Sequence, residues 1–299
     1  MTTFVIATFY KFADLPDFAE LREPILQYCR EFDDVKGSIL LAPEGINATI
    51  AGPRDDIDAV LAYLRANPKL ADMTHKESVA DFNPFPRIKV RLKREIVNLG
   101  MPEINPNNKV GTYVIAKDWN DLISDPEVIL IDTRNDFEVQ AGTFQGAINP
   151  ETISFNAFPQ YVQDNLDPEK HKKVAMFCTG GIRCEKASSY LLEQGFSEVF
   201  HLKDGILKYL EQVPEEESLW EGECFVFDQR ITVKHQLIPG EIEYCTHCQI
   251  ILTDEAKASP QFREGFYCPN CYDTIPAEKI ARLEERYFQV ELAEKRNCS

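Results

Sequence analysis

The stretch Cys178-Thr179-Gly180-Gly181-Ile182-Arg183-Cys184 determines the fold that we predict for the middle of the chain. The short apolar run Val174–Phe177 directly before it indicates a buried strand. After it, apolar residues recur at helical spacing from Ala187, and Gly195 stands where a left-handed residue can close a helix. The order of strand, short loop and helix therefore places Cys178 at the carboxyl end of the strand.

The loop itself predicts a reactive cysteine. Its glycines allow the backbone to curl, so that several amide groups can point at the sulfur of Cys178: those of Thr179, Gly180, Gly181 and Ile182. The positive end of the following helix adds to this effect. A free thiol has a pKa of about 8.5, and such surroundings lower the pKa towards or below neutrality. We therefore expect a thiolate nucleophile; the alternative is a buried, inert cysteine.

The size of the loop limits what it can hold. Arg183 follows Cys178 more closely than the arginine of a cysteine phosphatase does, and Phe177 stands where such enzymes usually carry a histidine. A ring of this size suits a single sulfur atom, as in a persulfide. Because Arg183 lies in the loop, we expect it to contact the substrate. Cys184 either resolves a persulfide by forming a disulfide with Cys178 or packs under the helix, and both interpretations stay open.

Four segments in order resemble the motifs of a rhodanese domain: Ile131–Arg134, Gly142–Pro150, the cysteine loop and Leu202–Ile206. With its flanking segments, the chain is similar over nearly its whole length to the rhodanese-type tRNA uridine hydroxylases. This resemblance implies an oxidoreductase that hydroxylates the wobble uridine of tRNA at C5, with molecular oxygen as co-substrate. It also implies a catalytic Cys178 that carries a persulfide, and hence a sulfur donor or a reductant as a partner.

Other functions use the same loop. A sulfurtransferase that passes sulfane sulfur to a small thiol, cyanide or RNA is the main alternative, and a non-enzymatic RNA-binding scaffold is the second. The five histidines are scattered singly, and no Gly-rich dinucleotide fingerprint is present. The sequence therefore carries no flavin or nicotinamide signature and does not identify the group that activates oxygen.

Residues 1–97 alternate between strands and helices. The predicted strands are Phe4–Tyr10, Ser38–Ala42, Asn47–Ala51 and Arg87–Val97, and the predicted helices are Phe18–Arg30 and Asp55–Arg65. This βαββαβ order predicts a ferredoxin-like α+β domain, with two helices on one face of an antiparallel sheet. The same region of the family is acylphosphatase-like, which agrees.

The last of these strands alternates apolar and basic residues. Arg87, Lys89, Arg91 and Lys93 therefore share one face, in a chain whose net charge is −17. We interpret this face as a surface that contacts tRNA phosphates without reading sequence. The alternatives are a solvated sheet face or a charged edge that resists aggregation.

Residues 98–109 are predicted to be a linker, and residues 110–219 a rhodanese-like α/β domain. Its short apolar strands, Val128–Asp132, Val174–Phe177 and Val199–Leu202, are separated by helical stretches, which indicates a parallel sheet with helices on both faces. Sites in such sheets lie beyond the carboxyl ends of the strands, where Cys178 stands. Asp132 and Arg134 are predicted to be a structural pair at the end of the sheet.

Residues 220–299 form the predicted C-terminal segment, which contains two Cys-x-x-Cys pairs. Cys245, Cys248, Cys268 and Cys271 match a zinc-ribbon-like site with four thiolates, although a redox-active or empty remnant has the same spacing. His247 is a competing ligand. A terminal helix is predicted over Ala277–Lys295, with a buried stripe of Ile280, Leu283, Tyr287 and Val290. Its arginines, Arg282, Arg286 and Arg296, contact either RNA or solvent.

The composition of the 299 residues limits the class of protein. The net charge of −17 argues against indiscriminate nucleic-acid binding. Residues Met1–Tyr10 lack the pattern of a signal peptide and no apolar run reaches about 18 residues, so we expect a cytoplasmic protein without membrane contact. Nine cysteines in such a protein indicate metal or catalytic chemistry in place of disulfides.

Overall fold

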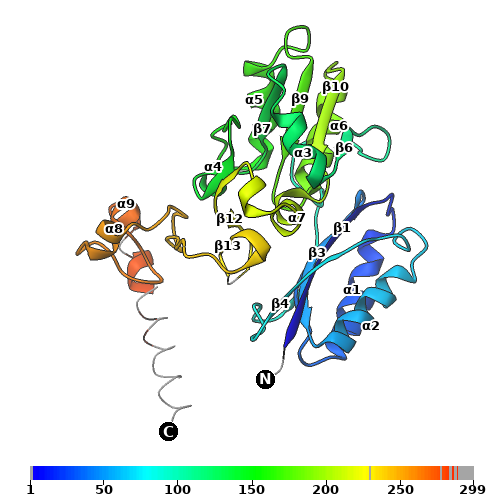
Figure 1. Cartoon of the computed structure of the whole chain (residues 1–299). Coiled ribbons are helices and arrows are strands. Elements are labelled where there is room, and N and C mark those ends of the chain that lie inside the picture. Colours follow the sequence, from blue (N-terminus) through cyan, green and yellow to red (C-terminus); the bar gives the residue numbers. More distant parts are fainter. Residues whose placement is uncertain (1–2, 229, 277, 283–284, 286–287, 289–299) are drawn as a thin grey trace. The chain divides into compact units, whose positions relative to one another are not determined.

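The computed structural model describes residues 3–228, 230–276, 278–282, 285 and 288. The chain divides into two units, Met1–Gly240 and Glu241–Ser299, which are described separately (Figure 1). Within the described residues, no helix has the length and apolar character needed to cross a bilayer.

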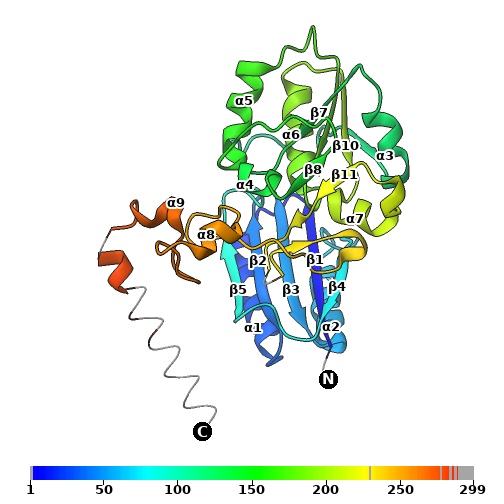
Figure 2. The same ribbon diagram turned by 60° about the vertical axis from the view of Figure 1, so that its left-hand side comes forward.

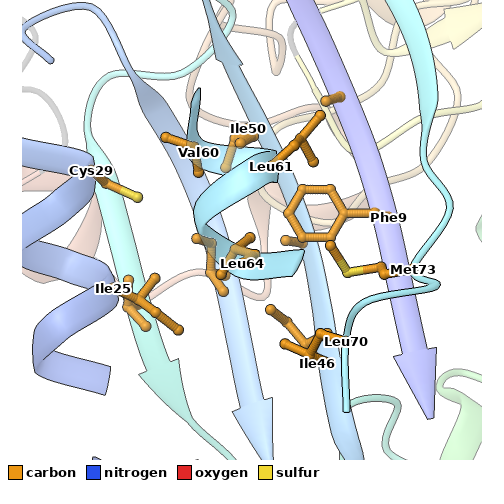
Figure 3. Close-up of a cluster of buried hydrophobic side chains, with 14 of the residues drawn as sticks. Phe9, Ile25, Cys29, Ile46, Ile50, Val60, Leu61, Leu64, Leu70 and Met73 are labelled. Atoms are coloured by element: carbon orange, nitrogen blue, oxygen red, sulfur yellow. The ribbon is translucent and has the colours of Figure 1, made fainter. Parts of the chain in front are cut away.

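The N-terminal half of the first unit is a five-stranded sheet with two helices on one face (Figures 1 and 2). Its elements are β1 (Phe4–Phe12), α1 (Phe18–Arg30), β2 (Lys36–Ala42), β3 (Gly45–Gly52), α2 (Arg54–Arg65), β4 (Lys76–Ala80) and β5 (Ile88–Leu92). The strand order is β4-β1-β3-β2-β5. Alternate residues of β1, such as Phe9, lie in one buried cluster with Ile25 of α1 and Leu61 of α2 (Figure 3). On the opposite face, Tyr10 and Phe12 pack with Ile96 and Ile182.

The last strand of the predicted βαββαβ order was assigned wrongly. The strand that completes this order is β4, which pairs antiparallel with β1, whereas β5 is an additional strand that pairs parallel with β2 at the other edge. The sheet is therefore mixed, and β5 ends at Leu92, before the predicted end at Val97. The sequence of β4 hides it because its one large apolar residue, Val79, is 63% exposed, so no alternation marks a buried face.

The second half of the first unit contains the predicted parallel α/β domain. Its sheet has the order β6-β10-β9-β7 with all neighbours parallel, formed by β6 (Thr112–Val114), β7 (Val128–Asp132), β9 (Lys173–Phe177) and β10 (Glu198–Leu202). Its helices are α3 (Ala116–Ile123), α4 (Asp136–Val139), α5 (Phe158–Asn165), α6 (Ile182–Glu193) and α7 (Gly205–Gln212). Separate apolar clusters cover the two faces of the sheet, one with α5 and α6 and the other with α3 and α7. Gly195 closes α6 with a φ of 94°, as predicted.

Segments on both sides of this domain pack into it. Leu99 and Ile104, from the predicted linker, are buried in the cluster that contains Cys178. After α7, strand β11 (Trp220–Gly222) pairs antiparallel with β8 (Gly142–Phe144), and β12 (Cys224–Phe225) pairs with β13 (Thr232–Val233). The first unit therefore extends to Gly240, whereas the sequence analysis began the C-terminal segment at residue 220.

A buried ion cluster joins the N-terminal half to α6. The Lys186 ammonium is fully buried and lies 2.5 Å from Glu44 Oε2 and 2.6 Å from Glu95 Oε1. Glu44 follows β2, and Glu95 lies between β5 and β6. Since Lys186 comes two residues after Cys184, this cluster fixes the N-terminal half against the helix that begins at the cysteine loop.

The second unit contains the short helices α8 (Asp254–Ala258) and α9 (Pro269–Tyr272). Its small core consists of Ile275 and cysteines, one of which, Cys271, lies in α9. Ile280 packs against this core. Most of the predicted terminal helix lies outside the described residues, including Leu283, Arg286, Tyr287, Val290 and Arg296.

Candidate active site and metal centre

Cys178 directly follows β9, and the loop after it turns sharply into α6. Gly181 is the residue before α6 and has a φ of 99°, a left-handed conformation that favours glycine. Its N–H donates a hydrogen bond of 3.1 Å to Cys178 Sγ. A Cβ at this position would lie 2.9 Å from the hydroxyl of Tyr10, so the tight turn depends on glycine here.

The start of α7 supports the loop from behind. The N–H groups of Ile206 and Leu207 donate to the carbonyls of Cys178 and Thr179, at 3.0 and 3.2 Å. Gly205 allows this approach, because a Cβ there would lie 2.5 Å from the Cys178 carbonyl oxygen. The Leu202–Ile206 motif therefore holds the backbone of the cysteine loop in place.

Cys178 is fully buried and its surroundings favour the thiolate. Burial opposes ionisation, but the Cys184 thiol, the Arg183 charge and the backbone N–H groups of Cys184 and Gly181 together lower the pKa of Cys178 to about 5. Of the amides predicted to face the sulfur, that of Gly181 donates a hydrogen bond to it, and the Cys184 N–H, which was not predicted, also lowers the pKa of Cys178. The Gly180 carbonyl points instead towards the N-terminal half, where Lys76 Nζ donates to it at 2.7 Å.

Cys184 lies in the first turn of α6 and is also fully buried. Burial and the neighbouring Cys178 thiolate raise the pKa of the Cys184 thiol well above its ordinary value, while Thr133, whose Oγ1 lies 3.4 Å from Cys184 Sγ, opposes this rise. Of the two loop cysteines, Cys178 is thus the one that ionises. The geometry makes Cys184 a neutral neighbour of the thiolate.

Arg183 is held by a residue that the sequence analysis missed. Both of its terminal nitrogens donate to the Glu138 carboxylate of α4, at 2.6 and 2.8 Å, and both side chains are buried. Although burial alone raises the pKa of Glu138, the Arg183 and Arg134 charges lower it below the ordinary value. The expectation that Arg183 contacts substrate is not supported by this geometry, because Glu138 occupies its guanidinium. Arg183 instead supplies a fixed positive charge beside Cys178.

Asp132 and Arg134 form the predicted pair, with the closest contact at 2.6 Å and no exposure of either side chain. Glu138 had one local signal in the sequence, since Asn135 and Glu138 stand at the spacing of a helix capping box, which α4 has. Nothing in that signal indicates its distant partner Arg183.

The N-terminal half contributes directly to the surroundings of the loop. Lys76 Nζ donates to the carbonyls of Gly180 and Asp204, at 2.7 and 2.5 Å. The Tyr10 hydroxyl donates to Glu185 Oε1 at 2.7 Å. These residues lie at a cavity of about 330 Å³ between the sheet and the cysteine loop. The sequence analysis assigned no role to Lys76, Tyr10 or Glu185.

The four basic residues predicted to contact RNA lie on β5 and at its ends: Arg87, Lys89, Arg91 and Lys93. Lys89 is half-buried and the others are exposed. Arg22 and Arg30 of α1 line one shallow hollow with Arg87, Lys89 and Arg91, which extends the positive surface beyond the strand. RNA binding by this surface stays a prediction.

Four cysteines of the second unit lie close enough together to bind one metal ion: Cys245, Cys248, Cys268 and Cys271. Their sulfurs lie within 4.8 Å of one another. The Sγ–Sγ distances are 3.7 Å between Cys245 and Cys271, 3.6 Å between Cys248 and Cys268, and 3.9 Å between Cys268 and Cys271. Zn–S bonds of about 2.3 Å in a tetrahedron place the sulfurs about 3.8 Å apart, so the arrangement fits zinc. The Cys268 N–H donates to Cys271 Sγ at 3.3 Å, which orients that ligand. His247 is not part of this group.

These features define the class of the central domain. A parallel sheet, a cysteine after an inner strand and a short loop that leads into a helix are the features of a rhodanese-like domain. Comparison with family models agrees: the model described as a rhodanese-like domain matches residues 116–212. The model described as a UPF0176 acylphosphatase-like domain matches residues 4–96.

The comparison with whole proteins is more specific. A protein of Picosynechococcus sp. named tRNA uridine(34) hydroxylase is 57% identical over 289 residues, which are 97% of this chain and 97% of that protein. The chain therefore belongs to the tRNA uridine(34) hydroxylase family, which confirms the resemblance found in the sequence.

Among solved structures, the rhodanese-like domain of an Anabaena sp. protein is 18% identical and has a TM-score of 0.30, covering 37% of this chain and 78% of that chain. An acylphosphatase from Coxiella burnetii is 16% identical with a TM-score of 0.24, covering 30% and 94%. These TM-scores are too low to add to the assignment.

Proposed function

We propose that the chain catalyses the oxygen-dependent 5-hydroxylation of uridine 34 in tRNA, with Cys178 as the catalytic residue. The observation that carries the proposal is the 57% identity with a relative named for this activity, over 97% of both chains. The thiolate surroundings of Cys178, whose pKa is lowered to about 5 after the opposing effect of burial, supply the reactive group.

The burial of Cys178 supports a persulfide as the form that reacts. The sulfur has no exposed surface, so a large RNA cannot reach it directly. One added sulfur extends the reactive atom by an S–S bond of about 2.05 Å. A sulfur donor is therefore part of the proposal, and the fixed charge of Arg183 stabilises the anion at this position.

The overall reaction also requires a reductant. One atom of oxygen enters at C5 of the base and the other leaves as water, so each turnover takes up two electrons and two protons. We propose that two thiols supply them and are joined in a disulfide, since 2 RSH gives RSSR, two protons and two electrons. A reducing cytoplasm fits this requirement, and all eight cysteines that the structure describes are free.

Two further parts of the chain have proposed roles. The basic surface on β5 positions the tRNA through its phosphates, and a zinc ion held by the four clustered cysteines stabilises the second unit. Neither part takes part in a chemical step.

A sulfurtransferase is the second candidate, because the loop holds one sulfur anion and a persulfide is the reactant of such enzymes. Mass analysis of tRNA nucleosides separates the two functions in a strain that lacks the protein. We expect 5-hydroxyuridine-derived nucleosides to disappear, to return with the wild-type gene and to stay absent with Cys178→Ser. Loss of thiolated nucleosides with normal hydroxylated ones would instead establish the sulfurtransferase.

A further inference from the structure

The cavity beside the cysteine loop has the size and position of a nucleotide site. Its volume is about 330 Å³, and its walls come from both halves of the first unit. Gly180 and Ile182 of the loop line it on one side, and Thr8, Tyr10 and Lys76 of the sheet on the other. A second cavity of about 460 Å³ also contacts Thr8 and Lys76 but contains no residue of the cysteine loop. Of these two cavities, the smaller is therefore the one that the cysteine loop lines.

The sheet connects this cavity to the basic surface on β5. Residues of β1 such as Phe9 point towards α1 and α2, so Thr8 and Tyr10 lie on the opposite face of the sheet. One cross-strand row on this face consists of directly paired residues, in the order Lys76, Thr8, Thr49, Ser38 and Lys89. With neighbouring strands about 4.8 Å apart, the row spans about 19 Å. Figure 2 shows the five strands side by side. The row thus connects Lys89 of β5 with Lys76, which lines the cavity.

Three side chains give the cavity its chemical character. Glu185, in the first turn of α6, accepts a hydrogen bond of 2.7 Å from the Tyr10 hydroxyl, and the Tyr113 hydroxyl also interacts with this carboxylate. A carboxylate has about four acceptor positions, so Glu185 keeps capacity for a ligand. The centroids of the Tyr113 and His201 rings lie 4.3 Å apart, so the two rings pack against each other. Tyr113 is still 44% exposed, which leaves a flat aromatic surface at the cavity.

We propose that the base of the target uridine binds in this cavity, with its ring against Tyr113 and its N3–H donated to Glu185. The inference rests on the proposed function and specifies how the base is selected. Uracil has an N–H at position 3, whereas cytosine has a lone pair there. A carboxylate that faces position 3 accepts from the N–H of uracil and is repelled by the lone pair of cytosine. Stacking on an aromatic ring does not distinguish the two bases.

Binding of two anticodon stem-loop RNAs that differ only by U34 or C34 tests this selection. The full chain with Cys178→Ser serves as the parent, since it binds without turnover. We expect the parent to prefer U34 roughly tenfold, and Glu185→Gln to bring the two affinities within about twofold, because an amide serves either base. Tyr113→Ala should weaken the binding of both RNAs about equally, by roughly tenfold. Glu193→Gln makes the same change at the exposed far end of α6 and should keep the preference.

A Glu185→Gln protein that keeps the U34 preference would overturn the proposal, as would a parent that binds neither RNA. Thermal melting checks that each variant folds. If Glu185→Gln does not fold, Tyr10→Phe decides: removal of the hydroxyl that orients Glu185 should lower the preference, and an unchanged ratio counts against the site. Hydroxylation of the U34 RNA by the wild-type chain is measured separately. Its absence rejects the proposed function, whereas its presence with an unchanged base preference in Glu185→Gln rejects only this inference.

Discussion

Replacement of Cys184 by alanine tests how the thiolate of Cys178 is stabilised. Burial opposes the thiolate, and the Cys184 thiol is the first of the groups that offset this and bring the pKa of Cys178 to about 5. A hydrogen bond to a charged group contributes about 1.5–3 kcal/mol, and 1.36 kcal/mol corresponds to one pKa unit. Cys184→Ala should therefore raise the pKa of Cys178 to about 6–7.

The reactive form of Cys178 is the thiolate, so a higher pKa lowers its reactivity at acidic pH. In the wild-type protein the thiolate fraction rises through a midpoint near pH 5 and is nearly complete at neutral pH. In Cys184→Ala the midpoint moves upward, so the thiolate fraction at pH 6 falls and then recovers as the pH rises. The titration is followed by ultraviolet absorbance of the thiolate, with the same chain carrying Cys178→Ser subtracted. Initial rates of alkylation provide an independent profile.

Two further variants sharpen the result. Cys184→Ser keeps a donor and should keep the midpoint near pH 5, whereas Cys29→Ala removes a distant buried thiol, whose pKa burial raises to about 11, and should change nothing. If Cys184 acts only as a hydrogen-bond donor to Cys178, serine also preserves turnover. If it resolves a persulfide, serine is as inactive as alanine after one cycle. A Cys184→Ala midpoint that stays near pH 5 would refute the electrostatic argument.

Three other regions give direct predictions. Cys245→Ser should lower the zinc content from about one ion per chain and unfold the second unit, measured by elemental analysis and proteolysis; a metal-free wild-type chain that resists proteolysis contradicts this. Lys89→Glu with Arg91→Glu should weaken tRNA binding and reduce the slope of log affinity against log salt by about 1 per lost contact, and an unchanged salt series argues against the surface. Lys186→Met should destabilise the first unit by about 3–5 kcal/mol in denaturant unfolding, because it leaves two buried carboxylates without a cation. Lys208→Met, at an exposed ion pair, is the matched control and should cost less than about 1 kcal/mol.

The parts of the site that could be predicted from sequence are local. The strand before Cys178, the turn at Gly181 and the helix closed by Gly195 all follow from residues within one short stretch, because each depends on neighbouring backbone. The four cysteines of the second unit were also predictable, since their spacing follows from the geometry of one ion.

The partners of these residues could not be predicted in the same way. Glu138 stands 45 residues from Arg183, and Lys76 stands 104 residues from Gly180. Such pairs form only when separate strands and helices are assembled, and a single carboxylate or ammonium in the sequence does not indicate its partner. The edge strand β4 was missed for a related reason, since half-exposed residues carry no alternating pattern.

The distance between the basic surface and the cavity separates affinity from base selection. Lys89 lies about 19 Å from Lys76 across the sheet, about twice the screening length of about 8 Å in physiological salt. If the charges at β5 bind tRNA as proposed, they act on the phosphates near them and have little effect on a base beside Glu185. A chain with a net charge of −17 repels RNA over most of its surface, so these cations also restrict how tRNA approaches. Added salt should lower the affinity for U34 and C34 RNAs together and leave their ratio unchanged, because that ratio depends on one uncharged N–H inside the cavity.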